Sequence, residues 1–171
     1  MSISADRPSP EPPPVVGRWL DADQQRSWRA LLLGTTLLMD RLDADLRAHC
    51  DLSMAEYEVL VRLSESEGRM RMARLAASLA HSRSRVTHTV ARMERAGLVE
   101  RVSADDDGRG IVAVLTAAGL DLLERIAPVH VNGVRDNLVD LVDPDDLAAV
   151  GRVLNAVADH LIGEHPEREL R

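Results

Sequence analysis

The sequence predicts a mainly α-helical protein in which a helix-turn-helix and a β-hairpin lie between long helices at the two ends of the chain. Aromatic residues make up only 2% of the 171 residues, so Leu, Val, Ala and Met must fill the core. Such a composition suits packed helices better than a β-sandwich. Apolar residues also recur at three- and four-residue steps, the spacing of an amphipathic helix. Two short apolar segments separated by a loop rich in Asp and Gly are typical of a hairpin.

The N-terminal part of the chain divides into a tail and a long helix. Residues 1–18 contain five prolines among Ser and charged residues. This segment cannot bury enough surface to offset the entropy cost of ordering, so a disordered tail is expected. A helix is predicted from about Asp21 to His49, because its apolar residues follow the helical spacing. These residues are Trp28, Leu31, Leu32, Leu38, Met39, Leu42 and Leu46.

A capping box marks the start of the second helix. In Ser53-Met54-Ala55-Glu56, the hydroxyl and the carboxylate can satisfy backbone N–H groups that have no partner inside the helix. The helix is expected to end near Gly68. Its apolar residues are Tyr57, Leu60, Val61 and Leu63.

Two helices joined by a tight turn follow, which is the outline of a helix-turn-helix. The first is short and breaks at Ala80-His81, and Ser82 is well placed to cap the second. The second ends at Ala96-Gly97, where glycine can adopt the left-handed conformation of a C-cap. The residues expected to face inward are Met72, Leu75, Ala76 and Leu79 in the first helix and Val86, Val90 and Met93 in the second.

A β-hairpin after these helices is expected to form a wing. Residues 98–102 and 111–115 are predicted strands, and the loop 103–110 between them is rich in turn-forming residues. A helix-turn-helix followed by such a hairpin is a winged helix-turn-helix.

Two further helices are predicted at the C-terminal end. Thr116 can cap the first, which is expected to run to about Leu141 with a kink at Pro128. Asp143 at the N-cap and Pro144 at the first helical position predict the start of the second. The apolar stripe of this last helix is Leu147, Val150, Leu154, Val157 and Leu161.

These elements predict how the chain is organised. Residues 1–18 form the proline-rich tail, 19–50 and 116–163 a helical dimerisation region, 51–115 the winged helix-turn-helix, and 164–171 a C-terminal tail. The terminal helices can pair with each other and with those of a second copy. We therefore expect a homodimer.

Charge is unevenly distributed along the sequence. The formal net charge is −7, yet Arg69 to Arg95 holds seven arginines and a single acid, Glu94. Residues 136–159 carry six aspartates against Arg152 alone. An acidic body with one basic module suggests a protein that approaches phosphate groups from one side.

The second helix of the helix-turn-helix carries the residues that DNA recognition requires. Cations contact phosphates, and polar side chains near the start of the helix can contact base edges in the major groove. Thr89 lies nearer the inner face, and Arg92 is the better candidate for a backbone contact. A merely solvated polar face is the alternative. The candidate DNA-binding residues on this helix are Ser82, Arg83, Ser84, Arg85, Thr87, His88, Thr89 and Arg92.

The tip of the predicted wing carries one more candidate. Arg109 lies between Gly108 and Gly110, which leave its guanidinium free to enter a narrow minor groove, where the electrostatic potential is most negative. Asp107 can hold Arg109 in place through an ion pair. An ordinary exposed loop arginine is the alternative.

Other chemistry finds little support in the sequence. The single cysteine, Cys50, excludes an internal disulfide and a thiolate zinc site, and Asp105-Asp106-Asp107 lacks the spacing of a calcium loop. No catalytic motif is found, so we expect no enzyme, cofactor or metal. Neither a membrane span nor a secretory signal is indicated, and a cytoplasmic protein is expected.

Several short motifs, distinctive in combination, carry a resemblance to a known family. They are Leu75-Ala76, Ser82 to Thr87, Met93 to Arg101, Asp107 to Gly110, and Leu115 to Gly119. In these motifs the chain resembles MarR-family transcriptional regulators over roughly residues 20 to 162. His81 is a departure, because the family often has an apolar residue at this turn position.

The resemblance implies a function and an assembly. The implied assembly is a triangular homodimer whose two winged modules bind a pseudo-palindromic operator in double-stranded DNA. The implied function is transcriptional repression, often relieved by a small anionic phenolic ligand or by cysteine oxidation. A helical interaction module or antirepressor-like regulator that does not bind DNA is the alternative, and the basic helix argues against it.

An effector pocket implied by the family would lie between the dimerisation helices and the winged module. Its candidate lining residues are Trp28, Met39, His49 and Tyr57. A core position is the favoured interpretation of Trp28, Met39 and Tyr57. An inert role is favoured for Cys50, since the neighbouring Asp51 opposes a low thiol pKa.

Overall fold

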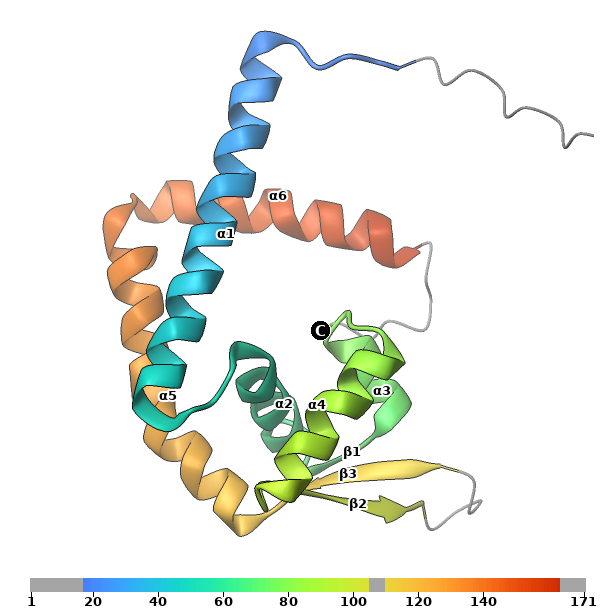
Figure 1. Ribbon diagram of the computed structural model, residues 1–171. Helices are drawn as coiled ribbons and strands as arrows, with labels where there is room; N and C mark the ends of the chain where they lie inside the picture. Colours follow the sequence, from blue (N-terminus) through green and yellow to red (C-terminus); the bar gives the residue numbers. More distant parts are fainter. Residues whose placement is uncertain (1–16, 105–109, 164–171) are drawn as a thin grey trace, which may run out of the picture. The chain divides into compact units, whose positions relative to one another are not determined.

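The computed structural model describes residues 17–104 and 110–163 (Figure 1). Helix α1 spans Ala22–Cys50, and the chain divides inside it into two units, residues 1–34 and 35–171. The Asp21 carboxylate accepts a hydrogen bond from the Gln24 N–H over 2.8 Å, and the Gln24 side chain accepts one from the Asp21 N–H over 3.1 Å. This reciprocal pair fixes the start of α1 where the sequence predicts it.

Helix α2 spans Met54–Ser64 and begins with the predicted capping box. The Ser53 N–H donates to the Glu56 carboxylate over 2.9 Å, and the Glu56 N–H donates to the Ser53 hydroxyl over 3.4 Å. The expected end near Gly68 is wrong by about one turn.

The predicted helix-turn-helix is confirmed as α3, Met72–Ser78, and α4, Arg83–Arg95. The Ser82 hydroxyl accepts a hydrogen bond from the Arg85 N–H over 3.3 Å and caps α4. Gly97 has φ +73° after the last turn of α4. It adopts the left-handed conformation that glycine tolerates without a steric cost.

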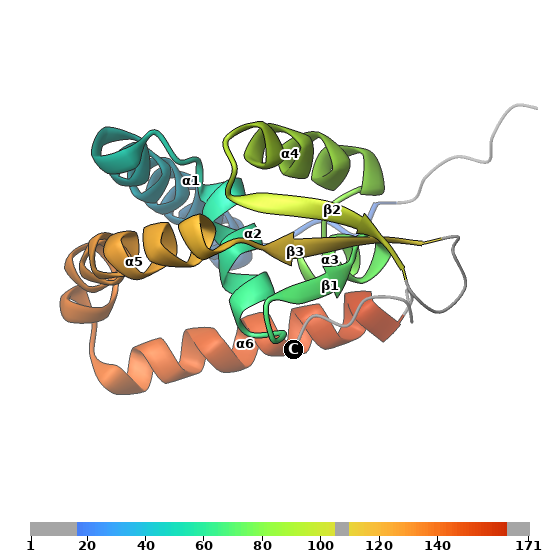
Figure 2. The same cartoon turned by 90° about the horizontal axis from the view of Figure 1, so that it is seen from below.

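Three short strands form one antiparallel sheet, in which β3 lies between β1 and β2 (Figure 2). Strands β2, Val99–Ser103, and β3, Ile111–Leu115, form the predicted hairpin. Strand β1, Arg69–Arg71, is not predicted from the sequence. Its three residues are too few to show a periodicity, and its partners on β3 lie more than 40 residues further along the chain, with Met70 opposite Ala113.

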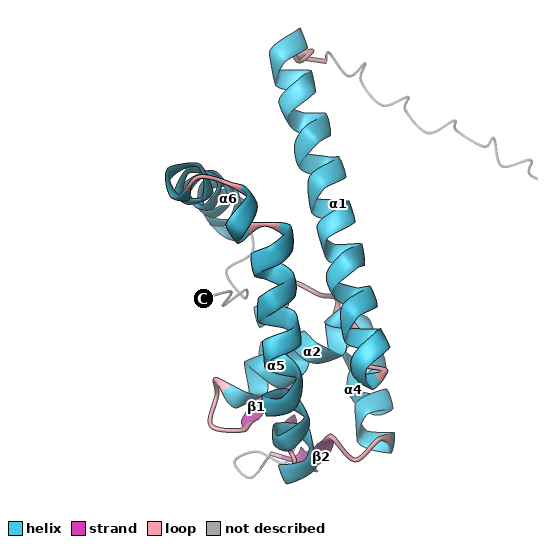
Figure 3. Ribbon diagram, turned by 90° about the vertical axis from the view of Figure 1, so that its left-hand side faces the viewer, coloured by secondary structure: helices cyan, strands magenta, loops and turns pink. Residues whose placement is uncertain are grey.

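The C-terminal segment contains α5, Ala117–Asn137, a short 3₁₀ helix η1, Val139–Leu141, and α6, Pro144–Gly163. The single helix expected up to Leu141 therefore ends four residues earlier, at Asn137. Pro128 lies inside α5. The Asp143 carboxylate accepts a hydrogen bond from the Asp145 N–H over 2.8 Å, which confirms it as the cap of α6. Helices make up most of the described chain (Figure 3).

One apolar cluster holds the winged module together and continues into the adjoining part of α5. Leu75 and Ala76 of α3 are buried in it as predicted, and Met72 and Leu79 are partly buried against it. The fully or almost fully buried side chains of this cluster include Leu46, Leu60, Leu63, Leu75, Val86, Val90, Met93, Val99, Ala113 and Ile126. None of the described helices combines the length and the apolar character that a membrane span needs.

Candidate nucleic-acid interface

Helix α4 is divided into an apolar inner face and a polar outer face. Val86, Val90 and Met93 are at most 1% exposed, which confirms the predicted inner face. Thr89 is half-buried, nearer the inner face as expected. The other predicted DNA-binding residues of α4 are exposed, and they are Ser82, Arg83, Ser84, Arg85, Thr87, His88 and Arg92.

Several of these polar side chains have partners within the helix. The Thr87 hydroxyl donates to the Arg83 carbonyl over 2.8 Å, and the Thr89 hydroxyl donates to the Arg85 carbonyl over 3.1 Å. Ser82 serves as the N-cap. The hydroxyl protons of both threonines are therefore engaged, which leaves their oxygens to act as acceptors.

Arg92 has an internal partner that the sequence did not predict. Its Nε donates to the Glu56 carboxylate over 2.6 Å, and its terminal nitrogen donates to the Ser53 hydroxyl over 3.0 Å. The guanidinium of a residue predicted to contact the DNA backbone thus joins α4 to the start of α2.

A second cationic feature lies beside the loop end of the hairpin. A hollow of about 280 Å³ is lined by Arg71 of β1 and by Arg83 and Thr87 of α4, together with Gly110. A Cβ atom on Gly110 would lie only 2.8 Å from a terminal nitrogen of Arg71, so this guanidinium passes close to the backbone there. Arg71 does not stand out in the sequence, because its place next to α4 depends on the pairing of β1 with β3.

Helix α4 and the hairpin are also joined by an ion pair. Arg101 on β2 donates to the Glu94 carboxylate from Nε over 2.9 Å and from a terminal nitrogen over 2.5 Å. The hydrogen bond from Arg101 holds the pKa of Glu94 below its ordinary value. The two predicted wing-tip residues, Asp107 and Arg109, lie outside the described residues.

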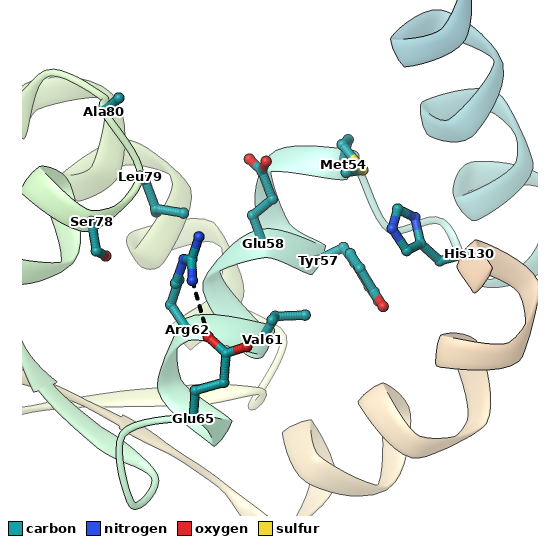
Figure 4. Close-up of a pocket in the computed structure, with 10 residues that line it drawn as sticks. All are labelled: Met54, Tyr57, Glu58, Val61, Arg62, Glu65, Ser78, Leu79, Ala80 and His130. Atoms are coloured by element: carbon teal, nitrogen blue, oxygen red, sulfur yellow. Dashed lines mark hydrogen bonds and ion pairs between the residues drawn. The ribbon is translucent and has the colours of Figure 1, made fainter. Parts of the chain in front are cut away.

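A pocket of about 380 Å³ lies between α2, the end of α3 and α5 (Figure 4). The Tyr57 and His130 rings face one another on its wall, with centroids 4.5 Å apart. Burial raises the pKa of Tyr57 and lowers that of His130. Charged side chains also line the pocket, and Arg62 pairs with Glu65 over 3.0 Å.

Of the four residues predicted to line an effector pocket, Tyr57 lines this one. His49 instead places a ring nitrogen 2.7 Å from the Asp45 carbonyl oxygen. Trp28 and Met39 are 50% and 49% exposed, so the interpretation of these two as core residues is wrong. Helix α1, which carries them, is amphipathic. Within each described unit, however, no other part of the chain covers its apolar stripe completely. His130 was missed because only the tertiary packing brings it to Tyr57.

Cys50 is half-buried at the end of α1. Its thiol donates a long hydrogen bond to the Leu46 carbonyl, with sulfur and oxygen 3.4 Å apart. Among the described residues, no group of three or more potential ligands is arranged to hold a metal ion.

Comparisons with known proteins agree with this architecture. A model of the MarR family matches residues 51–110. The crystal structure of AbsC, a MarR family transcriptional regulator from Streptomyces coelicolor, is 44% identical, with a TM-score of 0.81 over 86% of this chain and 99% of that one. Sco3205, a MarR family regulator from the same organism solved in complex with DNA, is 39% identical, with a TM-score of 0.81 over 84% and 94%. The HTH-type transcriptional regulator PecS of Dickeya dadantii is 26% identical over 77% of this chain and 82% of its own.

Proposed function

The chain belongs to the MarR family of transcriptional regulators, and from this premise we propose that it is a homodimeric repressor of a pseudo-palindromic operator, released by a small anionic ligand. Binding to DNA is the general activity of a transcriptional regulator of this kind, and the chain is not an enzyme. The operator, the repression, the dimer and the ligand are the proposed parts.

The exposed polar face of α4 is the observation that carries the proposal. Ser84 and His88 lie on this face and can reach base edges in a major groove, while Arg83 and Arg85 lie beside them at the start of the helix. Arg71 is a further phosphate contact in this proposal, because it shares a cationic hollow with Arg83. Arg109, supported by Asp107, is the proposed minor-groove contact.

Exposed apolar side chains on the terminal helices support the homodimer. In α6 no described residue is buried, and Val153 is 60% and Leu154 42% exposed. In the first unit, Leu33 is 63% and Trp28 50% exposed on α1. A monomer rarely leaves such rows of large apolar groups in water, and a second copy of the chain offers the same rows as a partner.

The pocket beside Tyr57 is the proposed effector site. Its volume of about 380 Å³ suits a small aromatic acid. The ring of such a ligand can pack against Tyr57, and its anionic group can displace Glu65 from Arg62. Leu79 and Ala80 also line the pocket, so a ligand there would contact the turn that leads into α4.

A selection from random DNA, followed by footprinting, tests the operator. Protection of two inverted half-sites about one helical turn apart is expected. Affinity should fall steeply as salt rises, because each phosphate contact releases counterions. An affinity that is independent of both the DNA sequence and the salt concentration would contradict operator binding.

A titration with small phenolic acids and urate tests the effector. A ligand of this site should weaken operator binding by the parent protein and leave Tyr57→Ala, at the pocket wall, unaffected. A reporter placed behind the selected operator tests repression, and expression should rise when the regulator is deleted. Equal expression with and without the regulator would argue against a repressor.

A further inference from the structure

Arg92 bridges the last part of α4 and the start of α2. It donates from Nε to Glu56 over 2.6 Å and from a terminal nitrogen to Ser53 over 3.0 Å. Its two partners precede it by 36 and 39 residues in the sequence. The contact is therefore tertiary, and it constrains how α4 is set against α2.

The Glu56 carboxylate is enclosed, and both of its oxygens are used. Its side chain is only 7% exposed, whereas that of Arg92 is 52% exposed. The oxygen that does not face Arg92 accepts hydrogen bonds from Ser53, over 2.9 Å from N–H and over 2.7 Å from the hydroxyl. A buried carboxylate is costly unless a cation and hydrogen-bond donors compensate it. If Arg92 turned toward a DNA phosphate, it would leave this carboxylate without its cation.

A second group of hydrogen bonds joins the start of α2 to the second part of α1. The Met54 N–H donates to Asp43 over 2.7 Å, and Arg47 donates to the other oxygen of Asp43 over 2.5 Å. The hydrogen bond from Arg47 and then that from Met54 hold the pKa of Asp43 below its ordinary value, and the charge of Arg92 adds to this effect. Helices α1 and α4 thus each bind the start of α2 through charge-assisted hydrogen bonds.

We propose that Arg92 is a positioning residue, which acts through Glu56 and Ser53 to fix the setting of α4 and hence of Ser84 and His88 on the operator. The apolar contacts of Val86, Val90 and Met93 hold α4 against the core, but apolar burial has no direction. The two hydrogen bonds of Arg92 add a directional constraint. This role rests on the proposed binding of an operator by α4.

The test measures operator affinity for Glu56→Gln, Arg92→Gln, Arg92→Lys and the double variant Glu56→Gln/Arg92→Gln over a range of salt concentrations. Glu56→Gln and Arg92→Gln are each expected to weaken binding by roughly two- to thirty-fold, the range of indirect coupling effects. The double variant should bind DNA no more weakly than the single variant with the lower affinity, because both changes break the same Arg92–Glu56 interaction. Lysine should not restore binding, since an ammonium group lacks the fork that reaches both partners.

The salt dependence of binding, the Glu56→Gln variant and the lysine variant separate positioning from a direct phosphate contact. A positioning role leaves the slope of log affinity against log salt unchanged in Arg92→Gln, as in the parent. A phosphate contact instead predicts a slope that is lower by about 0.9 for each phosphate that the variant no longer neutralises. Such a lower slope, together with parent-like binding by Glu56→Gln and rescue by lysine, would overturn the proposal. Arg41→Gln, which removes an exposed arginine paired with Asp45 within α1, is the matched control.

Hydrogen exchange in the full chain without DNA tests the constraint itself. Glu56→Gln and Arg92→Gln should both speed amide exchange in the last turns of α4, while Arg41→Gln should not. Unchanged exchange in both variants would overturn the proposal. If Glu56→Gln does not fold, the two Arg92 variants still test the proposal. The Arg92 side chain is half exposed, so its replacement leaves no buried cavity. If the parent binds no DNA, the proposed operator binding fails, and exchange still reports on the ion pair.

Discussion

The polar side chains of α4 differ in their hydrogen-bond partners, and therefore in the roles they can have. Ser82 caps the helix, and the hydroxyl protons of Thr87 and Thr89 bond to carbonyls one turn earlier. Arg92 is engaged with Glu56. We therefore propose Ser84 and His88 as base contacts, with Arg83 and Arg85 beside them as phosphate contacts.

Replacing Ser84 or His88 by alanine is expected to change the preference for particular base pairs. Removal of a base contact should cost about 1–3 kcal/mol at its own position and little elsewhere. A selection from random DNA, repeated with each variant, measures this change. Ser64→Ala on α2, where an exposed hydroxyl donates to the Val61 carbonyl over 2.8 Å, is the control. Base preferences identical in the parent and in both variants would exclude these residues as specificity determinants.

His130 should make the stability of the protein depend on pH. Burial lowers its pKa from the ordinary value of 6.5. The unfolded chain therefore binds a proton at a higher pH than the folded chain does, and stability falls as the pH drops through about 6.5. Burial, and then the charge of Arg85, lower the pKa of His81 as well, so it contributes in the same direction.

The variant His130→Phe tests this dependence. It keeps a ring against Tyr57 but cannot bind a proton, so the loss of stability below about pH 6.5 should become smaller than in the parent. Denaturant unfolding at several pH values measures the difference. His160→Phe, at an exposed position of α6, should keep the parent slope. Equal slopes for the parent and for His130→Phe would remove His130 as a cause.

The junction of the hairpin with α5 is the clearest example of how elements are joined. The Thr116 hydroxyl donates to the Gly97 carbonyl over 2.7 Å and accepts from the Gly119 N–H over 3.0 Å. One side chain thus connects the end of α4 with the cap of α5. The backbone approaches so closely here that a Cβ on Gly119 would overlap the Leu98 carbonyl oxygen and lie 2.8 Å from Leu115 Cδ1.

Gly119→Ala is expected to destabilise the protein by about 1–3 kcal/mol through this overlap. Helix propensity alone predicts the opposite sign, because alanine is favoured over glycine by about 1 kcal/mol inside a helix. Gly151→Ala in α6 is the matched control, since no atom beyond the backbone of its own helix lies within 4 Å of its Cβ position. Chemical unfolding measures both variants. A Gly119→Ala protein as stable as Gly151→Ala would show that the junction can relax.

For the whole molecule, the apolar surface of α6 and of the first unit is the main feature that the single chain does not explain. In α6 the stripe predicted from the sequence exists. Leu147 is half-buried, and the other four members, Val150, Leu154, Val157 and Leu161, are each at least 42% exposed. A second copy that covers this surface would account for the retention of so many apolar residues.

Leu154→Asp is expected to convert the proposed dimer into a monomer, because it places a charge where apolar groups would be buried. The monomer should bind a two-half-site operator roughly tenfold more weakly or worse, since the two half-sites no longer act together. Light scattering after size exclusion gives the mass, and a gel shift gives the affinity. Asn155→Asp adds the same charge beside it and should remain dimeric. A dimeric Leu154→Asp protein with parent affinity would exclude α6 from the interface.

The sequence by itself determined most helices, their caps and the inner face of α4. Capping boxes, the helical spacing of apolar residues and the left-handed Gly97 act over a few residues, so they can be read locally. The basic outer face of α4 follows from the same spacing. Residues 105–109 lie outside the described residues, so the roles of Asp107 and Arg109 remain predictions from the sequence.

Only the tertiary structure decided features that join distant segments. Strand β1 exists because β3 pairs with it, Arg92 binds Glu56 across 36 residues, and His130 reaches Tyr57 from α5. The exposure of Trp28 and Met39 is also decided by the tertiary structure, because a helical apolar stripe does not predict which segment packs against it. The physical reason is the same throughout: local patterns fix backbone conformation, whereas the partner of a side chain depends on how the whole chain packs.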